Sequence, residues 1–200
     1  MLYFLNDCKL RGLTSVTTCM ISYGANISGP FGEPVKTLEF ALKELKIRNL
    51  SIIKESKLYS SLAFPYSSEP RYLNGCFEIE VHCSAHAVLG HLKEVEVKMG
   101  SRKKSRWGSR ACDLDLLSFA NTVCPSNELF DHWYKMPLKQ QIVEKPHQLL
   151  LPHPRLQDRA FVLKPLMDFA EDWIHPILNL SVKEMFASLP KEDRDSVLPI

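Results

Sequence analysis

Several features are missing from this sequence, and each absence narrows what the chain can be. No stretch of about 18 apolar residues occurs, so no transmembrane helix is expected. The N-terminus places apolar residues before charged ones, the reverse of a secretory signal, so none is expected. No Cys-x-x-Cys pair is present. An even number of cysteines is compatible with disulfides, but the length and the missing signal favour reduced, mostly buried thiols in the cytoplasm. The cysteines are Cys8, Cys19, Cys76, Cys83, Cys112 and Cys124.

A strong charge imbalance is also absent. The net charge is only +2, so the chain as a whole does not attract polyanions, and any basic function must be local. Hydrophobic residues make up 45% and charged residues 24% of the sequence, which is typical of a globular protein with a core and not of a disordered chain. The 200 residues suffice for one domain with elaborations. No internal repeat or low-complexity tract is visible.

Hydrophobic patterning predicts the order strand, helix, strand, strand, helix, strand. Runs of β-branched and apolar residues predict the strands, and an i, i+3, i+4, i+7 apolar stripe predicts the first helix. This order is the split βαβ pattern. It predicts an α+β fold, a ferredoxin-like βαββαβ sandwich whose antiparallel sheet carries both helices on one face, with extra loops. The strands are expected at residues 16–23, 50–58, 73–82 and 112–119, and the helices from Pro34 onward and at 85–98.

The remaining segments are predicted to be mostly irregular. Proline, serine and basic residues indicate loops over residues 60–71 and 100–110. Residues 120–148 contain several prolines and no clear element, and are interpreted as an inserted loop. A short helix is expected over residues 161–170, with Pro165 breaking or kinking it. The charged C-terminal tail is expected to be loose. The predicted organisation is an extension at 1–16, one domain at 17–190 with an insertion at 120–150, and a tail at 191–200.

Two aspartates are the first candidates for chemistry. Asp113 and Asp115 lie two apart on a predicted strand, so their carboxylates share one face while Leu114 and Leu116 point to the core. Like charges placed so closely repel each other unless a cation lies between them, and oxygen ligands of this kind suit Mg²⁺. On the pair alone, however, an ordinary solvated strand face is the better interpretation.

The preceding loop changes that interpretation. It is rich in arginine and lysine, and arginine binds phosphate in a bidentate manner. Acids that hold metal beside bases that hold phosphate suit a magnesium–nucleotide complex better than a bare nucleic-acid backbone. Trp107 is either an aromatic wall for a substrate or a hydrophobic anchor for the loop. The basic residues of the loop are Arg102, Lys103, Lys104, Arg106 and Arg110.

The stretch from Arg106 to Phe119 resembles the signature of the 6-hydroxymethyl-7,8-dihydropterin pyrophosphokinase family of folate biosynthesis, which reads Arg-Trp-Gly-Pro-Arg, two residues, then Asp-x-Asp and an apolar run. Three other segments resemble the family in the right order, and the likeness spans roughly residues 17–180. They are Tyr23-Gly24-Ala25-Asn26, Pro70-Arg71-Tyr72-Leu73-Asn74-Gly75, and the block from Leu151-Pro152-His153-Pro154-Arg155 through Arg159-Ala160-Phe161-Val162-Leu163-Lys164-Pro165-Leu166.

This resemblance implies transfer of pyrophosphate from ATP to the hydroxymethyl oxygen of the dihydropterin, with release of AMP. It implies two Mg²⁺ ions on Asp113 and Asp115, with Arg110 as the third catalytic residue. No histidine or glutamate is placed by motif as a general base at the hydroxyl. The implied ATP-binding residues are Glu96, Lys103, Arg106, Arg110, Leu116, His153 and Arg159, and the implied pterin-binding residues are Ser61, Leu62, Phe64, Tyr72, Asn74, Trp107 and Phe161.

Plainer interpretations stand beside these roles. Asn74 beside Gly75 is also compatible with a simple turn, and Phe161 with a core position. His153 between two prolines is an improbable core residue, which favours a function. A further group, made up of His82, Cys83, His86 and His91, crosses a strand–helix junction, which disfavours a zinc site there.

The sequence also departs from the family pattern at several positions. Ser101 stands where the family commonly has an arginine, Ser109 replaces a proline, and Arg71 replaces an acid. Two other functions therefore stay open: a catalytically weakened member that acts as a partner of another folate enzyme, and a ligand- or RNA-binding module of the same fold. The resemblance also implies association or fusion with dihydropteroate synthase or dihydroneopterin aldolase, and predicts neither nucleic-acid nor membrane partners.

Overall fold

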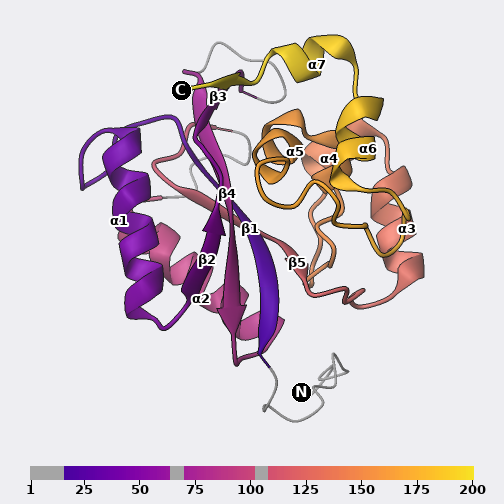
Figure 1. The fold of residues 1–200 in the computed structure, drawn as a ribbon, viewed down its shortest axis with the longest axis horizontal. Coiled ribbons are helices and arrows are strands. Elements are labelled where there is room, and N and C mark those ends of the chain that lie inside the picture. Colours follow the sequence, from indigo (N-terminus) through magenta and orange to yellow (C-terminus); the bar gives the residue numbers. More distant parts are fainter. Residues whose placement is uncertain (1–15, 64–69, 102–107) are drawn as a thin grey trace.

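The computed structural model describes residues 16–63, 70–101 and 108–200 (Figure 1). None of the helices in these ranges has the length and apolarity needed to cross a bilayer. The elements are β1 (Thr17–Ala25), α1 (Pro34–Ile47), β2 (Ser51–Glu55), β3 (Tyr59–Ser61), β4 (Tyr72–Val81), α2 (Ala85–Lys98), β5 (Asp113–Phe119), α3 (Asn127–Lys135), α4 (Leu138–Val143), a 3₁₀ turn (Leu156–Asp158), α5 (Ala160–Leu166), α6 (Val182–Ser188), α7 (Lys191–Asp195) and β6 (Leu198–Pro199).

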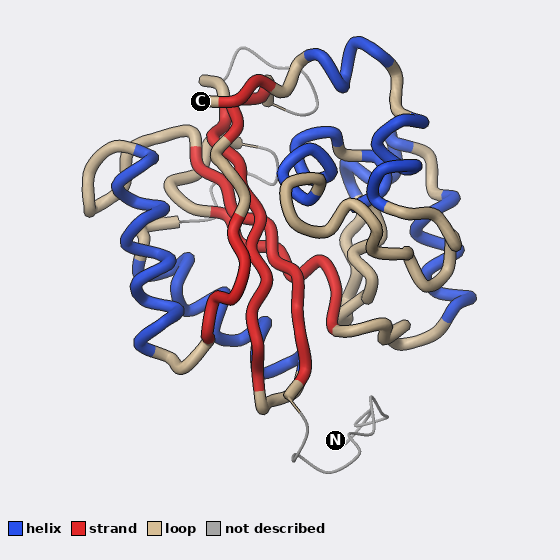
Figure 2. Tube along the Cα trace, in the orientation of Figure 1, coloured by secondary structure: helices blue, strands red, loops and turns tan. Residues whose placement is uncertain are grey.

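One antiparallel sheet forms the centre of the molecule (Figure 2). Its strand order is β5-β1-β4-β3-β6, and β2 pairs with β4 farther along the same edge as β3. The long β1–β4 ladder runs from Thr17 opposite Val81 to Ala25 opposite Leu73. The other edge of β1 pairs with β5, with Gly24 opposite Asp113. The predicted α+β class and the antiparallel sheet are confirmed.

Helices α1 and α2 cover one face of the sheet, as predicted (Figure 1). Pro34 begins α1, and Ser84 caps α2 by accepting a hydrogen bond from Ala87 N at 3.2 Å. The apolar stripes of both helices are fully buried against the strands, for example Leu45 of α1 and Leu92 of α2. Burying each such leucine contributes about 2 kcal/mol, so this layer supplies much of the core.

A second layer covers the opposite face of the sheet. Met20, Cys76 and Leu117 point to that side and pack against α5 and α6, including Leu163 and Val182. Figure 1 shows α1 and α2 on one side of the strands and α5 and α6 on the other. Local sequence patterns predicted only the short helix of this layer. The prediction at 161–170 places α5 correctly but ends too late, because the helix stops at Leu166, just after Pro165.

The prediction of a structureless insertion at residues 120–148 is wrong, because α3 and α4 lie within it. The prolines that suggested a loop precede the helices: Pro125 comes before the cap of α3, and Pro137 comes directly before α4. Ser126 caps α3 by accepting a hydrogen bond from Leu129 N. Phe130 and Trp133 then form the buried stripe of α3.

Two other loop predictions need correction. The predicted loop at 60–71 begins too early, because Tyr59–Ser61 form β3 against β4. The tail was predicted to be loose, yet residues 191–200 form α7 and β6, and β6 pairs with β3. Both short strands depend on partners distant in the sequence, which no local pattern reveals.

Five cysteines lie in the described ranges, all as free thiols, and four of them are buried. Burial raises the pKa of the Cys19 thiol to about 12. The expectation of reduced, mostly buried cysteines is confirmed for these five.

Buried His175 should make the fold sensitive to acid. Its Nδ1 accepts hydrogen bonds from Ile177 N and Leu178 N, and the rings of Phe130 and Trp173 lie beside it. Burial lowers its pKa to about 4, from the ordinary value near 6.5. An unfolded chain therefore takes up this proton at higher pH than the folded chain, so stability is full above about pH 6.5 and is lost as pH falls toward 4.

We expect the free energy of unfolding to fall by about 2 kcal/mol more between pH 7 and pH 5 in the wild type than in a His175→Gln variant. Urea unfolding at both pH values measures this difference. Equal losses in the two proteins would contradict it.

Candidate active site

A large cleft of about 980 Å³ lies beside the β5 edge of the sheet. Its walls come from β1, β4 and β5, from α2, from the start of α5, and from the segment after α4. The volume suits a nucleotide and a second small molecule. Eleven of the predicted site residues line it: Ser61, Leu62, Tyr72, Asn74, Arg110, Asp113, Asp115, Leu116, His153, Arg159 and Phe161.

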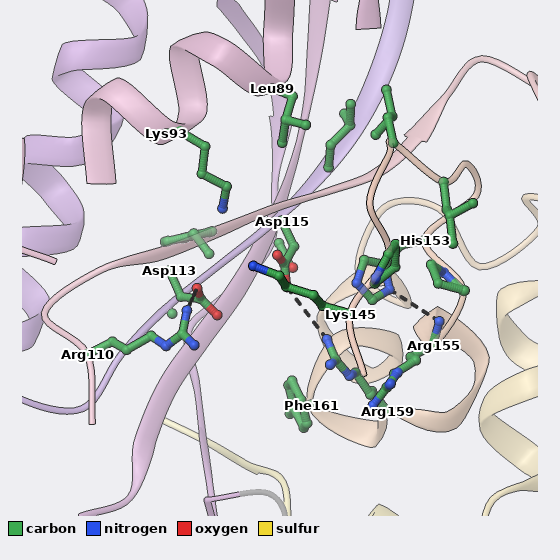
Figure 3. Close-up of a pocket in the computed structure, with 18 of the residues that line it drawn as sticks. Leu89, Lys93, Arg110, Asp113, Asp115, Lys145, His153, Arg155, Arg159 and Phe161 are labelled. Carbon is green, nitrogen blue, oxygen red and sulfur yellow. Dashed lines mark hydrogen bonds and ion pairs between the residues drawn. The ribbon is translucent and has the colours of Figure 1, made fainter. Parts of the chain in front are cut away.

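The two aspartates lie together on one face of β5. Asp113 and Asp115 alternate with buried Leu114, as the period of a strand requires, and about a third of each aspartate side chain is exposed to the cleft. Arg110 Nη1 donates to Asp113 Oδ1 at 2.7 Å, and Arg159 Nη1 lies 3.5 Å from Asp115 Oδ2. Figure 3 shows the two arginines approaching the pair from different segments of the chain.

The electrostatics of the pair fit a cation site. Burial and the charge of Asp115 raise the pKa of the Asp113 carboxyl, although Arg110 opposes them. Burial also raises the pKa of Asp115, but the interaction with the His153 ring and the positive charges of Arg159 and Lys93 outweigh it, so the net shift is downward. Two carboxylates that repel each other are the donor set that Mg²⁺ takes together with phosphate oxygens and water. In the described ranges, no group of three or more acidic, histidine or cysteine side chains could hold a metal by protein atoms alone.

His153 and Arg159 face the aspartates from the segment that leads into α5. The amide of His153 donates to Leu117 O at 2.8 Å, which fixes this segment against β5. Burial lowers the pKa of His153 to about 4, and the charge of Arg159 adds to this effect. Because Nδ1 accepts from Arg155 N at 3.2 Å, the neutral ring carries its proton on Nε2. His153 is therefore a neutral hydrogen-bond donor.

Glu96 does not line the cleft. Its carboxylate is buried behind the wall, where Oε1 accepts from Leu114 N at 2.8 Å and from Lys93 Nζ at 2.7 Å. Burial raises the pKa of Glu96, and Lys93 opposes the shift. The structure thus places Lys93 in the cleft and Glu96 behind it, where Glu96 holds both Lys93 and the backbone of Leu114 between the two aspartates.

The other end of the cleft is a hydrogen-bonding and aromatic pocket. Asn74 and Ser61 are buried neighbours on β4 and β3, and Asn74 Nδ2 donates to Ser61 Oγ at 2.9 Å. Asn74 and Gly75 both lie within β4, so the alternative that they form a turn is wrong. Gly75 is needed there, because an added Cβ would come within 2.5 Å of the Tyr23 ring. Tyr72 and half-buried Phe161 complete the walls.

Four predicted site residues lie outside the described ranges. They are Phe64, Lys103, Arg106 and Trp107.

Comparison with known proteins supplies the deciding observation. The sequence model of the 7,8-dihydro-6-hydroxymethylpterin-pyrophosphokinase (HPPK) family matches residues 20–171. The chain belongs to this family. The match includes both aspartates, Asn74 and the His153–Phe161 segment, so the cleft is built from the part of the chain that defines the family.

Curated relatives carry names of the same kind. A 2-amino-4-hydroxy-6-hydroxymethyldihydropteridine pyrophosphokinase of Synechocystis is 29% identical over 87% of this chain and 77% of its own length. The folic acid synthesis protein of Pneumocystis carinii is 27% identical over 90% of this chain but only 21% of its own length. This chain thus spans about a fifth of that larger relative. Wild-type Plasmodium falciparum HPPK-DHPS shares the fold, with a TM-score of 0.60 at 13% identity over 86% of this chain and 43% of its own.

Two departures from the HPPK pattern have local structural partners. Ser101 Oγ hydrogen-bonds to Cys112 O and accepts from Cys112 N at 2.9 Å, so it fastens the start of the loop to the start of β5. Ser109 Oγ accepts from Asn26 Nδ2 at 3.0 Å. Ser101 therefore holds the backbone next to Asp113, and Ser109 contacts the side chain of Asn26.

Asn26 belongs to one of the matching segments, but no sequence pattern predicted a role for it. In the structure it connects distant parts of the site. It is 5% exposed, donates to Pro70 O at 3.1 Å, and accepts from Arg110 N at 2.7 Å. One side chain thus joins the segment before β4 to the loop that carries Arg110. Its position directly after a β-strand was visible in the sequence, but its partners were not.

Residues 120–150 supply a wall of the HPPK cleft, which the sequence did not predict. Lys145, His147 and Trp133 line the cleft from this region, and Figure 3 shows Lys145 projecting into it. Arg155 Nη2 donates to Gln141 O at 3.2 Å, which ties α4 to the Pro-His-Pro-Arg motif. The two prolines flanking His153 made that motif visible, whereas nothing local indicated that Lys145 reaches the same cavity.

Proposed function

We propose that this chain transfers the pyrophosphoryl group of ATP to the hydroxymethyl oxygen of 6-hydroxymethyl-7,8-dihydropterin and releases AMP. The observation that carries this proposal is that one cleft holds both halves of the required chemistry. An acidic pair flanked by Arg110 and Arg159 occupies one part, and the Asn74–Ser61 pocket with aromatic walls occupies another. The names of the curated relatives support the same reaction.

The triphosphate would lie over the aspartates. Asp113 and Asp115 would hold two Mg²⁺ ions, which neutralise phosphate charge and lower the pKa of the attacking hydroxyl when bound. Arg110 and Arg159 already point at this position, and Lys93 and neutral His153 add donors to it. Lys103 and Arg106, which precede Arg110 in the sequence, stay proposed contacts of ATP. Leu116 would provide an apolar contact for the nucleotide.

The pterin would occupy the Asn74 pocket. Asn74 would read the ring edge, Tyr72 and Phe161 would frame its faces, and Ser61 and Leu62 would complete the pocket; Phe64 and Trp107 stay proposed contacts. In the reaction, the hydroxymethyl oxygen would lose its proton to solvent and form a bond to the β-phosphorus, while the bond from that phosphorus to the α–β bridging oxygen breaks and that oxygen leaves with AMP. The protein would act mainly by positioning both substrates and by stabilising the charge on the moving group.

We expect AMP to be released only when ATP, Mg²⁺ and the hydroxymethyl-dihydropterin are all present. Chelation of the metal should abolish the activity and excess Mg²⁺ should restore it, because two carboxylates and the phosphates need a bridging cation. Chromatographic measurement of AMP tests this directly. Release of ADP, or AMP release without the pterin, would contradict the proposal, and no turnover at all would favour the catalytically weakened member instead.

Three finer assignments belong to the same proposal. The order β5-β1-β4-β2, with both connecting helices on one face, supports a ferredoxin-like assignment for this part of the sheet. The HPPK-DHPS titles of the structural neighbours support association or fusion with dihydropteroate synthase. We place the enzyme in the cytoplasm, where folate synthesis would supply its substrate.

A further inference from the structure

The last residues of the chain are tied to the strand that carries Ser61. β6 pairs with β3, with Leu198 opposite Ser60 and Pro199 opposite Tyr59, and Ile200 N donates to Leu58 O at 3.1 Å. β3 is only three residues long, and its other edge pairs with β4. The C-terminal strap, defined as residues 196–200, thus prevents β3 from being a short exposed edge.

The strap also reaches the opposite wall of the pocket. Val197 is 4% exposed and forms a small core with Tyr59 and Ala160, against which Phe161 packs. Phe161 lines the cleft at this end. By contrast, the side chains of Leu198 and Ile200 are exposed. The strap therefore acts through its backbone pairing and through one buried side chain that lies between the two walls.

The side chain of Arg71 hydrogen-bonds to both β3 and the strap. Its Nε donates to Ser60 Oγ at 2.7 Å, and its Nη2 donates to Ser60 O at 3.2 Å and to Ser196 O at 2.9 Å. Because side chains alternate along a strand, Ser60 points away from the cleft while Ser61 points into it and accepts from Asn74. One guanidinium thus connects the strap to β3. Arg71 itself directly precedes Tyr72, which lines the pocket.

We propose that Arg71 and the C-terminal strap are positioning elements for the pterin substrate. They set the spacing between the Ser61–Asn74 wall and the Phe161 wall, and they leave the aspartates untouched. This inference rests on the proposed function. The aspartate end has supports that involve neither Arg71 nor the strap: Glu96 accepts from Leu114 N, and His153 N donates to Leu117 O. The strap should therefore affect one substrate and not the other.

Steady-state kinetics of the full chain test this. Arg71→Ala and Val197→Ala should each raise the KM for the hydroxymethyl-dihydropterin about 10-fold, a loss of about 1.4 kcal/mol of binding. The KM for ATP and the kcat should stay within about 2-fold, because uniform binding of one substrate is lost. Arg71→Lys should recover only part of the affinity, since lysine lacks the fork that reaches Ser60 and Ser196 together.

Two matched controls separate positioning from general destabilisation. Val81→Ala removes the same atoms from a buried valine at the far end of β4, and Lys191→Ala removes a cation of α7 that pairs locally with Asp195. Neither should change the KM for the pterin. If Arg71→Ala and Val197→Ala leave that KM unchanged, or raise the KM for ATP equally, the inference is wrong. Arg71 is exposed, so its variant should fold even if Val197→Ala does not.

A failure of the proposed function would look different. In that case the wild type would release no AMP with the dihydropterin, whatever its variants do. Equilibrium binding of the hydroxymethyl-dihydropterin to the wild type and to Arg71→Ala then tests the positioning role of Arg71 and the strap independently of catalysis. A dissociation constant that rises about 10-fold in the variant supports it, and equal constants overturn it.

Discussion

Replacing Asp115 with alanine should lower the kcat for AMP release by about 10³-fold or more, because the variant loses a carboxylate proposed to hold Mg²⁺ against the phosphates. Asp115 lies on β5 opposite Ser22, and its one ion-pair contact within the described residues is Arg159 at 3.5 Å. Among the described residues, no third acidic, histidine or cysteine side chain completes a metal-binding group with the two aspartates.

The same variant should stay folded. In the metal-free protein, Asp115→Ala removes both the repulsion from Asp113 and the ion pair with Arg159, so its melting temperature should stay close to that of the wild type. Addition of Mg²⁺ and ATP should then raise the melting temperature of the wild type and not of the variant. Asp172→Ala, an exposed aspartate outside this cleft, is the matched control and should behave like the wild type in both measurements. Near-normal turnover in Asp115→Ala would overturn the metal-site assignment.

Replacing Arg110 with alanine should lower kcat by about 10²- to 10³-fold, the effect expected when one charged donor to the transferred group is lost. The loop itself should keep its shape. Arg110 O accepts from Asn26 N at 3.0 Å, and Arg110 N donates to Asn26 Oδ1 at 2.7 Å, so the backbone is held without the guanidinium. Arg110→Lys should restore only part of the rate, because a lysine cannot bind phosphate in a bidentate manner.

Rapid-quench measurement of a single turnover separates this loss from slow product release. Arg48→Ala is the control: Arg48 also pairs with a carboxylate, Glu44 at 2.6 Å, but it lies on the α1 side of the sheet. A single-turnover rate in Arg110→Ala that matches this control would show that Arg110 does not act on the transferred group.

Local sequence patterns predicted the helices and strands whose periodicity involves only residues close together in the sequence. The stripes of α1 and α2 and the apolar runs of β1, β4 and β5 placed these elements to within a few residues. The prolines of residues 120–148 suggested a loop, but they precede α3 and α4 and do not replace them. The second helical layer was only partly visible, because α5 is short and contains Pro165.

The sequence by itself determined the acidic pair, since the period of a strand alone puts Asp113 and Asp115 on one face, and it determined the family through segments that match in order. Tertiary structure decided how those segments meet. Asn26 contacts Arg110 across 84 positions, and Arg71 contacts Ser196 across 125. It also put Glu96 behind the wall, Lys145 in the cleft and the tail against β3. Such contacts depend on how the whole chain packs, which no local periodicity encodes.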